Sequence, residues 1–223
     1  MEKRIVKTAL ITGCSSGIGL ALTKKMLEQN YQVLATTKSG KLAIDHPRLT
    51  VVELDLSVNE SIEAAGHRIA QLNLQIDLLI NNAGVAPDIH LTKPSYTSFT
   101  ATLAVNLTGT VFFTECILPL LSSSAQIINV SSAMGLFANA APNAYAYRIS
   151  KAGLNFYTKL LALLYKDTDI EVKAIHPGWV RTKLGGADAD VDEEWSANEI
   201  FNTLLAHNSG QFIDVYAKES FLM

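Results

Sequence analysis

This sequence has little cysteine, no large excess of either sign of charge and no long hydrophobic run. Its two cysteines, Cys14 and Cys116, cannot form a disulfide scaffold. Together with five dispersed histidines they give no spacing typical of zinc ligands, so we expect no metal. The N-terminus, M-E-K-R-I-V-K-T-A, lacks the apolar stretch and small-residue cleavage site of a signal peptide. These features favour a reducing, cytoplasmic setting.

Neither sign of charge dominates the chain. It has 18 Lys and Arg against 21 Asp and Glu, a formal net charge of −3, and the basic residues are scattered. We therefore expect no nucleic-acid partner. The apolar stretch 111–121 is interrupted by Glu115 and Pro119, and no run reaches the roughly 18 residues that a membrane span requires. We expect no membrane partner either.

Apolar segments of two kinds alternate along the 223 residues, 48% of which are hydrophobic. Continuous apolar runs indicate strands covered on both faces; they fall at 8–12, 32–36, 49–53, 78–81, 126–130, 171–175 and 212–215. Segments with helical periodicity fall at 17–29, 57–72, 98–121, 144–166 and 198–206. This alternation predicts an α/β fold over 1–223, a single-domain, doubly wound parallel sheet of the Rossmann type with about seven strands and helices on both faces.

A glycine-rich turn, T-G-C-S-S-G-I-G, follows the first expected strand and opens a helix. Gly13, Gly17 and Gly19 leave room for backbone N–H groups and the helix N-terminus to approach a pyrophosphate. The alternative is a plain strand–helix connection that needs positive φ. The place of the turn in an alternating α/β chain favours a dinucleotide cofactor.

The second expected strand ends in A-T-T-K-S, with no acidic residue to bind the adenine ribose of NAD. Lys38, with the hydroxyls of Thr36, Thr37 and Ser16, suits the 2′-phosphate of NADP, because a cation offsets that charge. The alternative for Lys38 is an ordinary solvated lysine. We expect NADP(H) to be preferred, with NAD(H) as a possible substitute.

Tyr147 and Lys151 are four residues apart in Y-R-I-S-K and therefore share one face of a helix. An ammonium near a phenol stabilises the phenolate, which lowers the tyrosine pKa from about 10. The alternative is an amphipathic helix surface. Ser131 and Ser132 follow the strand I-I-N-V at the sheet edge where ligands bind, although serine is also common in turns.

Two further strands end in small residues at the same edge. One is followed by N-N-A-G, ending at Gly84, and the other by H-P-G-W-V-R-T, where Pro177 and Gly178 fix a turn. Trp179 and Trp195 are candidate cavity or lid aromatics, with core packing as the alternative.

Taken together, T-G-C-S-S-G-I-G, N-N-A-G, V-N-L, V-S-S, Y-R-I-S-K and H-P-G-W-V resemble the short-chain dehydrogenase/reductase family, in order over about residues 8 to 216. The Y-A-Y-R-I-S-K-A-G-L-N and H-P-G-W-V-R-T-K-L-G-G segments are similar to its C-factor and sniffer-like carbonyl reductase branch. The resemblance implies four catalytic residues. Asn106 would hold a relay water, Ser132 would polarise a carbonyl, Tyr147 would be the acid/base, and Lys151 would bind the nicotinamide ribose and depress the tyrosine pKa.

Tyr145 competes with Tyr147, because it lies 13 residues after Ser132, the separation in many family members. Only Tyr147 is one helical turn from Lys151, so geometry favours Tyr147. Tyr145 would then pack at the helix start or line the site.

The resemblance also implies cofactor contacts. Asp55 matches an adenine-contacting aspartate, with a helix N-cap as the alternative, and Val180 and Thr182 match positions that hold the carboxamide. The full expected set is Gly13, Ser15, Ser16, Gly17, Ile18, Gly19, Thr37, Lys38, Asp55, Leu56, Asn82, Ala83, Gly84, Tyr147, Lys151, Pro177, Gly178, Val180 and Thr182.

These residues predict an NADP(H)-dependent oxidoreductase that acts on a small carbonyl or alcohol, with an NADP-binding sensor of little turnover as the alternative. A short substrate lid is expected near 183–197, whose acidic residues are expected to form a solvated face. The family implies a homodimer or homotetramer through the helices at 98–121 and 144–166. An apolar stripe suits that seam, with intramolecular packing as the alternative; it comprises Phe112, Phe113, Cys116, Ile117 and Leu120.

Overall fold

A computed structural model of the chain describes residues 6–223. The strands are β1 (Thr8–Ile11), β2 (Gln32–Thr37), β3 (Leu49–Glu53), β4 (Ile76–Asn81), β5 (Leu121–Val130), β6 (Glu171–His176), β7 (Gln211–Asp214) and β8 (Glu219–Leu222). The α-helices are α1 (Gly17–Glu28), α2 (Asn59–Ala70), α3 (Tyr96–Leu103), α4 (Thr110–Ile117), α5 (Tyr145–Leu164) and α6 (Glu193–Asn202). The 3₁₀ helices are Leu118–Leu120, Ala133–Gly135, Phe137–Asn139 and Thr203–Leu205, and Ala104–Gly109 is π-helical.

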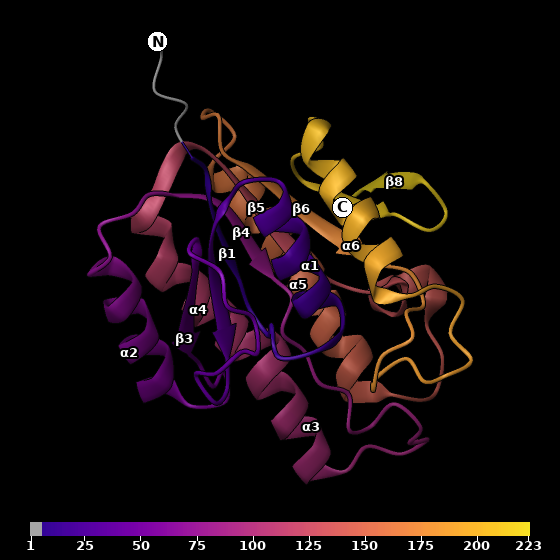
Figure 1. Cartoon of the computed structure of the whole chain (residues 1–223). Coiled ribbons are helices and arrows are strands. Elements are labelled where there is room, and N and C mark those ends of the chain that lie inside the picture. The colour runs from indigo at the N-terminus through magenta and orange to yellow at the C-terminus, as the bar shows by residue number, and fades with distance from the viewer. Residues whose placement is uncertain (1–5) are drawn as a thin grey trace.

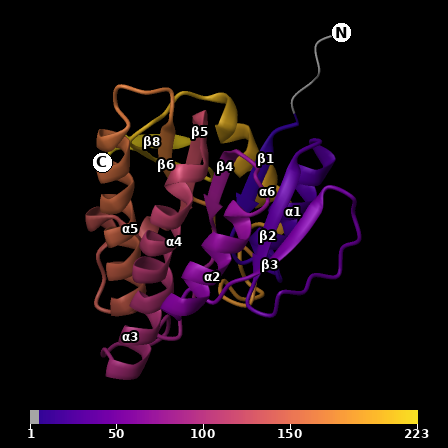
Figure 2. The same ribbon diagram turned by 90° about the vertical axis from the view of Figure 1, so that its left-hand side faces the viewer.

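All strands belong to one sheet in the order β3-β2-β1-β4-β5-β6-β7-β8. Every pair is parallel except β7 with β8. Figure 1 and Figure 2 show α1 and α6 on one face, and α2, α4 and α5 on the other. The predicted doubly wound α/β fold is therefore confirmed.

Successive strand residues face opposite cores, which explains why the strands are apolar without alternation. In β5, Ile127 packs on the side of α2, α4 and α5, whereas Ile128 packs on the side of α1 and α6. Leu10 and Ile11 of β1 divide in the same way.

Among residues 6–223 the sheet has eight strands, whereas about seven were expected. The eighth, β8, is an antiparallel edge strand that follows a tight turn in which Lys218 has φ +57°. The carboxylate of Asp214 accepts the amide hydrogens of Tyr216 (3.0 Å) and Ala217 (2.9 Å) and so holds the turn. Its residues, E-S-F-L, do not form a continuous apolar run, which is why the sequence pattern did not predict this strand.

The helix expected at 98–121 is interrupted by the π-helical turn Ala104–Gly109. Among the described residues, the stretch Tyr96–Leu120 is long and apolar enough, by length and composition alone, to cross a membrane. Polar groups of this stretch bond to the sheet and within the helix: the Thr114 hydroxyl accepts from the side chain of Asn81 (2.8 Å) and donates to the Thr110 carbonyl (2.7 Å). This composition is that of a helix packed on a sheet.

The expected apolar stripe is divided between core and surface. Phe113 and Ile117 are fully buried against the sheet, as the intramolecular alternative requires, whereas Phe112 is 55% exposed. A second exposed apolar face lies on α5 and comprises Ile149, Phe156, Leu160, Leu163 and Leu164.

The last expected helix begins five residues early. Asp192 caps α6 by accepting the amide hydrogen of Trp195 (2.8 Å), and Glu193 and Glu194 form its first turn, where acidic side chains suit the helix dipole. Residues 193–197 of the expected lid are therefore helical.

Candidate active site

The turn between β1 and α1 packs backbone against backbone. Gly13 has φ +73°, and a Cβ there would lie 2.8 Å from the Cα of Ala83. A Cβ on Gly19 would lie 2.3 Å from the Gly13 carbonyl oxygen. Only glycine fits these two positions. Ser15 and Ser16 are exposed, and no side chain caps α1, so its first amides are open to a phosphate.

Thr12, which sequence analysis missed, joins this turn to the end of β4. Its hydroxyl accepts the amide hydrogens of Asn82 and Ala83, both at 3.0 Å. The Asn82 side chain donates to the Thr12 carbonyl at 2.8 Å. In the sequence, this role of Thr12 was indicated only by its place directly before Gly13.

At the ends of β2 and β3, two residues that were expected to bind the cofactor bind each other. The Lys38 ammonium lies 2.6 Å from the Asp55 carboxylate. Hydrogen bonds from Lys38 and Ser57 hold the pKa of Asp55 at about 2. Asp55 bonds to Ser57 and does not cap α2, whose N-cap is Val58. The helix N-cap alternative for Asp55 is therefore wrong.

Thr37 and Leu56 face away from the expected cofactor region. The Thr37 hydroxyl bonds to the backbone N–H and carbonyl of Lys41, both at 3.1 Å, and closes the loop after β2. Leu56 packs in the core with Phe113. If either residue contacts a cofactor, it does so through its backbone.

Tyr147 and Lys151 lie one turn apart on α5, as expected, and both are buried. The Lys151 ammonium is 5.7 Å from the centre of the Tyr147 ring and donates a hydrogen bond to the Val130 carbonyl at 2.8 Å. Burial lowers the pKa of Lys151 to about 8.

Burial raises the pKa of Tyr147, and the interaction with Ser132 offsets only part of the rise. The predicted lowering of the tyrosine pKa is therefore absent from this arrangement. The physical reason is that desolvation of the phenolate outweighs an ammonium that is turned toward a carbonyl.

The two serines after β5 differ in their hydrogen bonds. The Ser131 hydroxyl donates to the Asn155 side chain at 2.5 Å and is committed to the interior. Ser132 begins a 3₁₀ helix and accepts the Met134 amide hydrogen at 3.1 Å, and it interacts with Tyr147. The structure thus places Ser132, as expected, beside the tyrosine.

Asn106 lies in the π-helical turn and is fully buried. Its side chain accepts the Val85 amide hydrogen and donates to the Val85 carbonyl, both at 2.8 Å. It also donates to the hydroxyl of Ser150 at 3.1 Å. A Cβ on Gly84 would lie 3.5 Å from both the Asn106 amide oxygen and the Lys151 ammonium, so the three residues meet.

A cavity of about 540 Å³ opens at the carboxyl edge of the sheet. The expected residues that line it are Ile18, Asn82, Gly84, Ser132, Tyr147, Lys151, Pro177, Gly178, Val180 and Thr182. Tyr145 is not among its walls, which supports Tyr147. Trp179 lines the cavity, whereas Trp195 packs against Tyr216 with ring centres 6.0 Å apart. The remaining walls include Ile89, His90, Met134 and Leu184.

This geometry fits a nicotinamide dinucleotide along the sheet edge. The glycine turn leaves room for the pyrophosphate, and the cavity places Lys151 and Tyr147 where the nicotinamide end would lie. Among the described residues, no group of three or more metal-ligating side chains is present.

Comparison with known proteins agrees with this arrangement. The family profile described as short chain dehydrogenase matches residues 7–192. The NADPH-bound carbonyl reductase from chicken fatty liver is 28% identical with a TM-score of 0.89, and the match covers 98% of this chain and 94% of that one. The carbonyl reductase Sniffer of D. melanogaster is 29% identical with a TM-score of 0.85, covering 95% and 97%.

A curated relative, the 3-oxoacyl-acyl-carrier-protein reductase FabG of Aquifex aeolicus, is 32% identical over 189 residues, 80% of this chain and 75% of that protein. The chain belongs to the short-chain dehydrogenase/reductase family. It is an oxidoreductase of that family, with carbonyl reductases among its relatives.

Proposed function

We propose that the protein is an NADP(H)-dependent carbonyl reductase that transfers hydride between the nicotinamide and a small carbonyl or alcohol substrate. One observation carries the proposal: Ser132, Tyr147 and Lys151 wall one cavity beside the glycine turn. The chicken and Drosophila relatives, which are described as carbonyl reductases, support the same activity.

In this proposal, the hydroxyls of Ser132 and Tyr147 hold the substrate carbonyl oxygen. NADPH, when bound, supplies the hydride. Tyr147 gives its proton to the developing alkoxide, and its raised pKa keeps it protonated beforehand at neutral pH. Below its pKa of about 8, Lys151 carries the charge that favours the phenolate left behind.

Asn106 acts in the proposal through the loop after β4. Its amide holds both backbone groups of Val85 and reaches Ser150 on α5. These bonds fix Val85 and Ser150, which lie close to Lys151. The family resemblance implies that a relay water is held in this region.

We propose a preference for NADPH over NADH on the basis of Lys38, whose side chain is 78% exposed just after β2. Asp55 shares this charge at 2.6 Å, so the 2′-phosphate would compete with the carboxylate for the lysine. The expected preference is therefore moderate.

The outer walls of the cavity favour an apolar substrate body. Ile89, Met134, Trp179 and Leu184 surround the region beyond the reactive hydroxyls. Residues 183–192, between Thr182 and α6, form the proposed short lid. The Trp179 indole N–H donates to the Gly185 carbonyl at 2.8 Å and connects this lid to the loop that follows β6.

The experiment is an assay of NADPH consumption, followed by its absorbance, with a panel of aldehydes, ketones and quinones. Turnover with any of them that disappears in Tyr147→Phe supports the proposal. Tight NADPH binding without turnover on the whole panel would contradict it and favour an NADP-binding sensor.

We also propose a homodimer or homotetramer. The exposed apolar face of α5, defined above, together with Phe112, is where a second copy would pack. Light scattering tests this assembly, and Phe156→Lys, in a residue that is 66% exposed, should dissociate it. A monomeric wild-type protein would contradict it.

A further inference from the structure

The loop between β4 and α3 is docked on the first turn of α5, the helix that carries Tyr147. The amide of Ala144, a buried non-glycine residue with φ +48°, donates to the Leu91 carbonyl at 2.9 Å. The Asp88 carboxylate accepts the amide hydrogens of Ala146 at 2.8 Å and Tyr147 at 3.3 Å. No side chain at the N-cap position does so, since that residue is Ala144.

Capping a helix with Asp88 has a free-energy cost, because its carboxylate must be buried. It is 2% exposed, and its second oxygen, Oδ1, is buried without a hydrogen-bond partner among the described residues. The two amide bonds and the positive end of the α5 dipole offset the cost of burying the charge. A serine or asparagine at the N-cap would satisfy the same amides locally without that cost. Helix stability alone therefore does not account for this arrangement.

The same loop reaches Tyr147 by a second route. The Tyr147 carbonyl accepts the Ser150 hydroxyl at 2.7 Å, and Ser150 in turn accepts from Asn106 at 3.1 Å. Asn106 is bonded to both backbone groups of Val85, three residues before Asp88. The backbone of Tyr147 is thus held at its amide and at its carbonyl, and both connections end in residues 85–88.

Asp88 is also next to the cavity. The two residues that follow it, Ile89 and His90, wall the cavity into which Tyr147 points. Because the Asp88 carboxylate accepts the Tyr147 amide hydrogen, it connects the position of the Tyr147 phenol to the cavity wall formed by Ile89 and His90.

We propose that Asp88 is a positioning residue: it fixes the start of α5, and with it the Tyr147 hydroxyl, to the substrate-facing loop. This role rests on the proposed carbonyl reductase activity, because it acts through Tyr147. A displacement of about 1 Å in a reacting group can cost about 100-fold in rate.

The test compares Asp88→Ala with Asp88→Asn. The alanine variant has no acceptor for the two amides, whereas asparagine keeps one oxygen for them and loses the charge. For Asp88→Ala we expect kcat to fall about 10- to 100-fold, with the dissociation constant for NADPH unchanged and faster hydrogen exchange at the Ala146 and Tyr147 amides. Asp88→Asn should recover most of kcat and most of the protection from exchange.

The matched control is Asp77→Ala. Asp77 also accepts a backbone amide hydrogen, from Thr8 at 2.8 Å, but it lies at the start of β4, away from the cavity. The Asp77→Ala variant should have a lower melting temperature than the wild type and an unchanged kcat. If Asp88→Ala does not fold, Asp88→Ser, whose hydroxyl is too short to bridge both amides, takes its place with the same expectations.

Unchanged kcat in Asp88→Ala, with only a lower melting temperature, would overturn the proposal and leave a structural cap. A fall in kcat that Asp88→Asn does not recover would also overturn it. Failure of the proposed function looks different, because the wild-type protein would then turn over no carbonyl, and the amide exchange would still report whether Asp88 holds the Tyr147 amide.

Discussion

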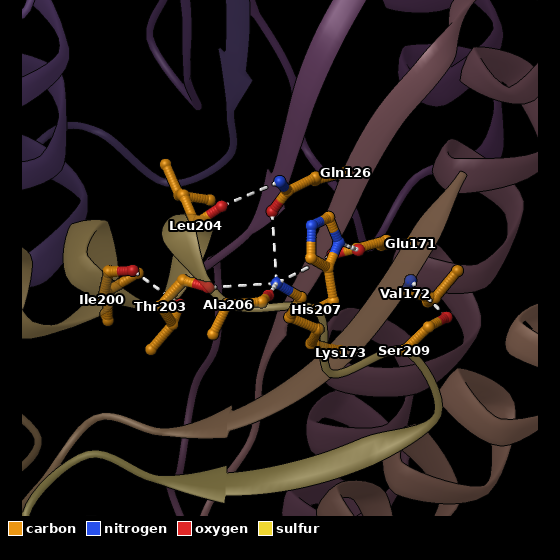
Figure 3. Close-up of polar contacts among 10 residues, drawn as sticks. All are labelled: Gln126, Glu171, Val172, Lys173, Ile200, Thr203, Leu204, Ala206, His207 and Ser209. Carbon is orange, nitrogen blue, oxygen red and sulfur yellow. Dashed lines mark hydrogen bonds and ion pairs between the residues drawn. The ribbon is translucent and has the colours of Figure 1, made fainter. Parts of the chain in front are cut away.

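Lys151 and Lys173 are both buried, toward opposite ends of the sheet, and their surroundings differ. Lys173, in β6, donates to the carbonyls of Thr203 (3.0 Å) and Ala206 (2.5 Å) and to the side chain of Gln126 (3.3 Å). Its charge is met by Glu171 at 3.0 Å, and Glu171 also bonds to His207 (Figure 3). Every ligand of this ammonium is in place, so Lys173 joins the end of α6 to the sheet.

Lys151 has a single acceptor, the Val130 carbonyl, and no carboxylate among the described residues within ion-pair distance. Burial without a counter-ion lowers its pKa to about 8. Glu171 behaves in the opposite way: burial raises its pKa, but His207 and Lys173 outweigh burial and leave the pKa below its ordinary value. A buried charge with all its partners supports structure, whereas one with few partners beside a cavity is available for chemistry.

The largest effect on activity should come from Tyr147, whose phenolate the Lys151 ammonium is proposed to stabilise. Tyr147→Phe removes the proton donor while keeping the ring, so kcat for carbonyl reduction should fall about 100- to 10,000-fold. Binding of NADPH, measured by fluorescence titration, should be nearly unchanged. An active Tyr147→Phe protein would show that the cavity is not the reactive end.

Lys173→Met tests whether the fully bonded lysine contributes to the stability of the fold. It leaves the carbonyls of Thr203 and Ala206 without their buried donor and the partly buried Glu171 without its lysine, so the free energy of unfolding should fall by about 3–5 kcal/mol. Denaturant unfolding measures this loss, and activity per folded molecule should stay at the wild-type level. A stable variant would mean that the cluster around Glu171 contributes nothing to the fold.

The pH dependence of stability distinguishes the two lysines next. Above about pH 8 the folded Lys151 is neutral, while the unfolded lysine keeps its proton up to its ordinary pKa of 10.5. The unfolded state then binds more protons, so stability gains a favourable contribution as the pH rises through this window, by up to about 3 kcal/mol. The difference between wild type and Lys151→Met, from unfolding curves at several pH values, isolates this contribution; a flat difference would contradict the burial of an unpaired Lys151.

The smallest effect concerns the exposed Lys38. Lys38→Ala should weaken NADPH binding about tenfold and leave NADH binding unchanged, because only the 2′-phosphate meets this cation. Dissociation constants for both cofactors, measured by fluorescence, check this. Equal losses for NADPH and NADH would show that the lysine does not recognise the 2′-phosphate.

The sequence predicted most of the fold because apolar runs and helical periods are local properties. The expected strands agree with β1 to β4, β6 and β7 within two residues. The π-helical turn at Ala104–Gly109 was not predicted, because one added residue per turn barely alters the spacing of the apolar residues. The start of α6 escaped because its cap, Asp192, lies in a stretch of charged residues without apolar periodicity.

The site was predicted as far as its residues act through their own side chains. Tyr147, Lys151 and Ser132 share the cavity, as expected. What could not be predicted depends on pairing between distant segments. Lys38 and Asp55 meet because β2 and β3 end side by side, and Asp88 caps a helix 58 residues further along the chain. The opposite direction of the Tyr147 pKa follows from burial, which sequence spacing does not reveal.

We expect Lys151, which has a single acceptor, to support catalysis, and Lys173, which is fully bonded, to support the fold alone. The most direct measurement is the rate of carbonyl reduction by NADPH-loaded Lys151→Met and Lys173→Met, each expressed per folded molecule. We expect a loss of about 100-fold or more in Lys151→Met and a rate close to wild type in Lys173→Met. A wild-type rate in Lys151→Met would contradict this expectation.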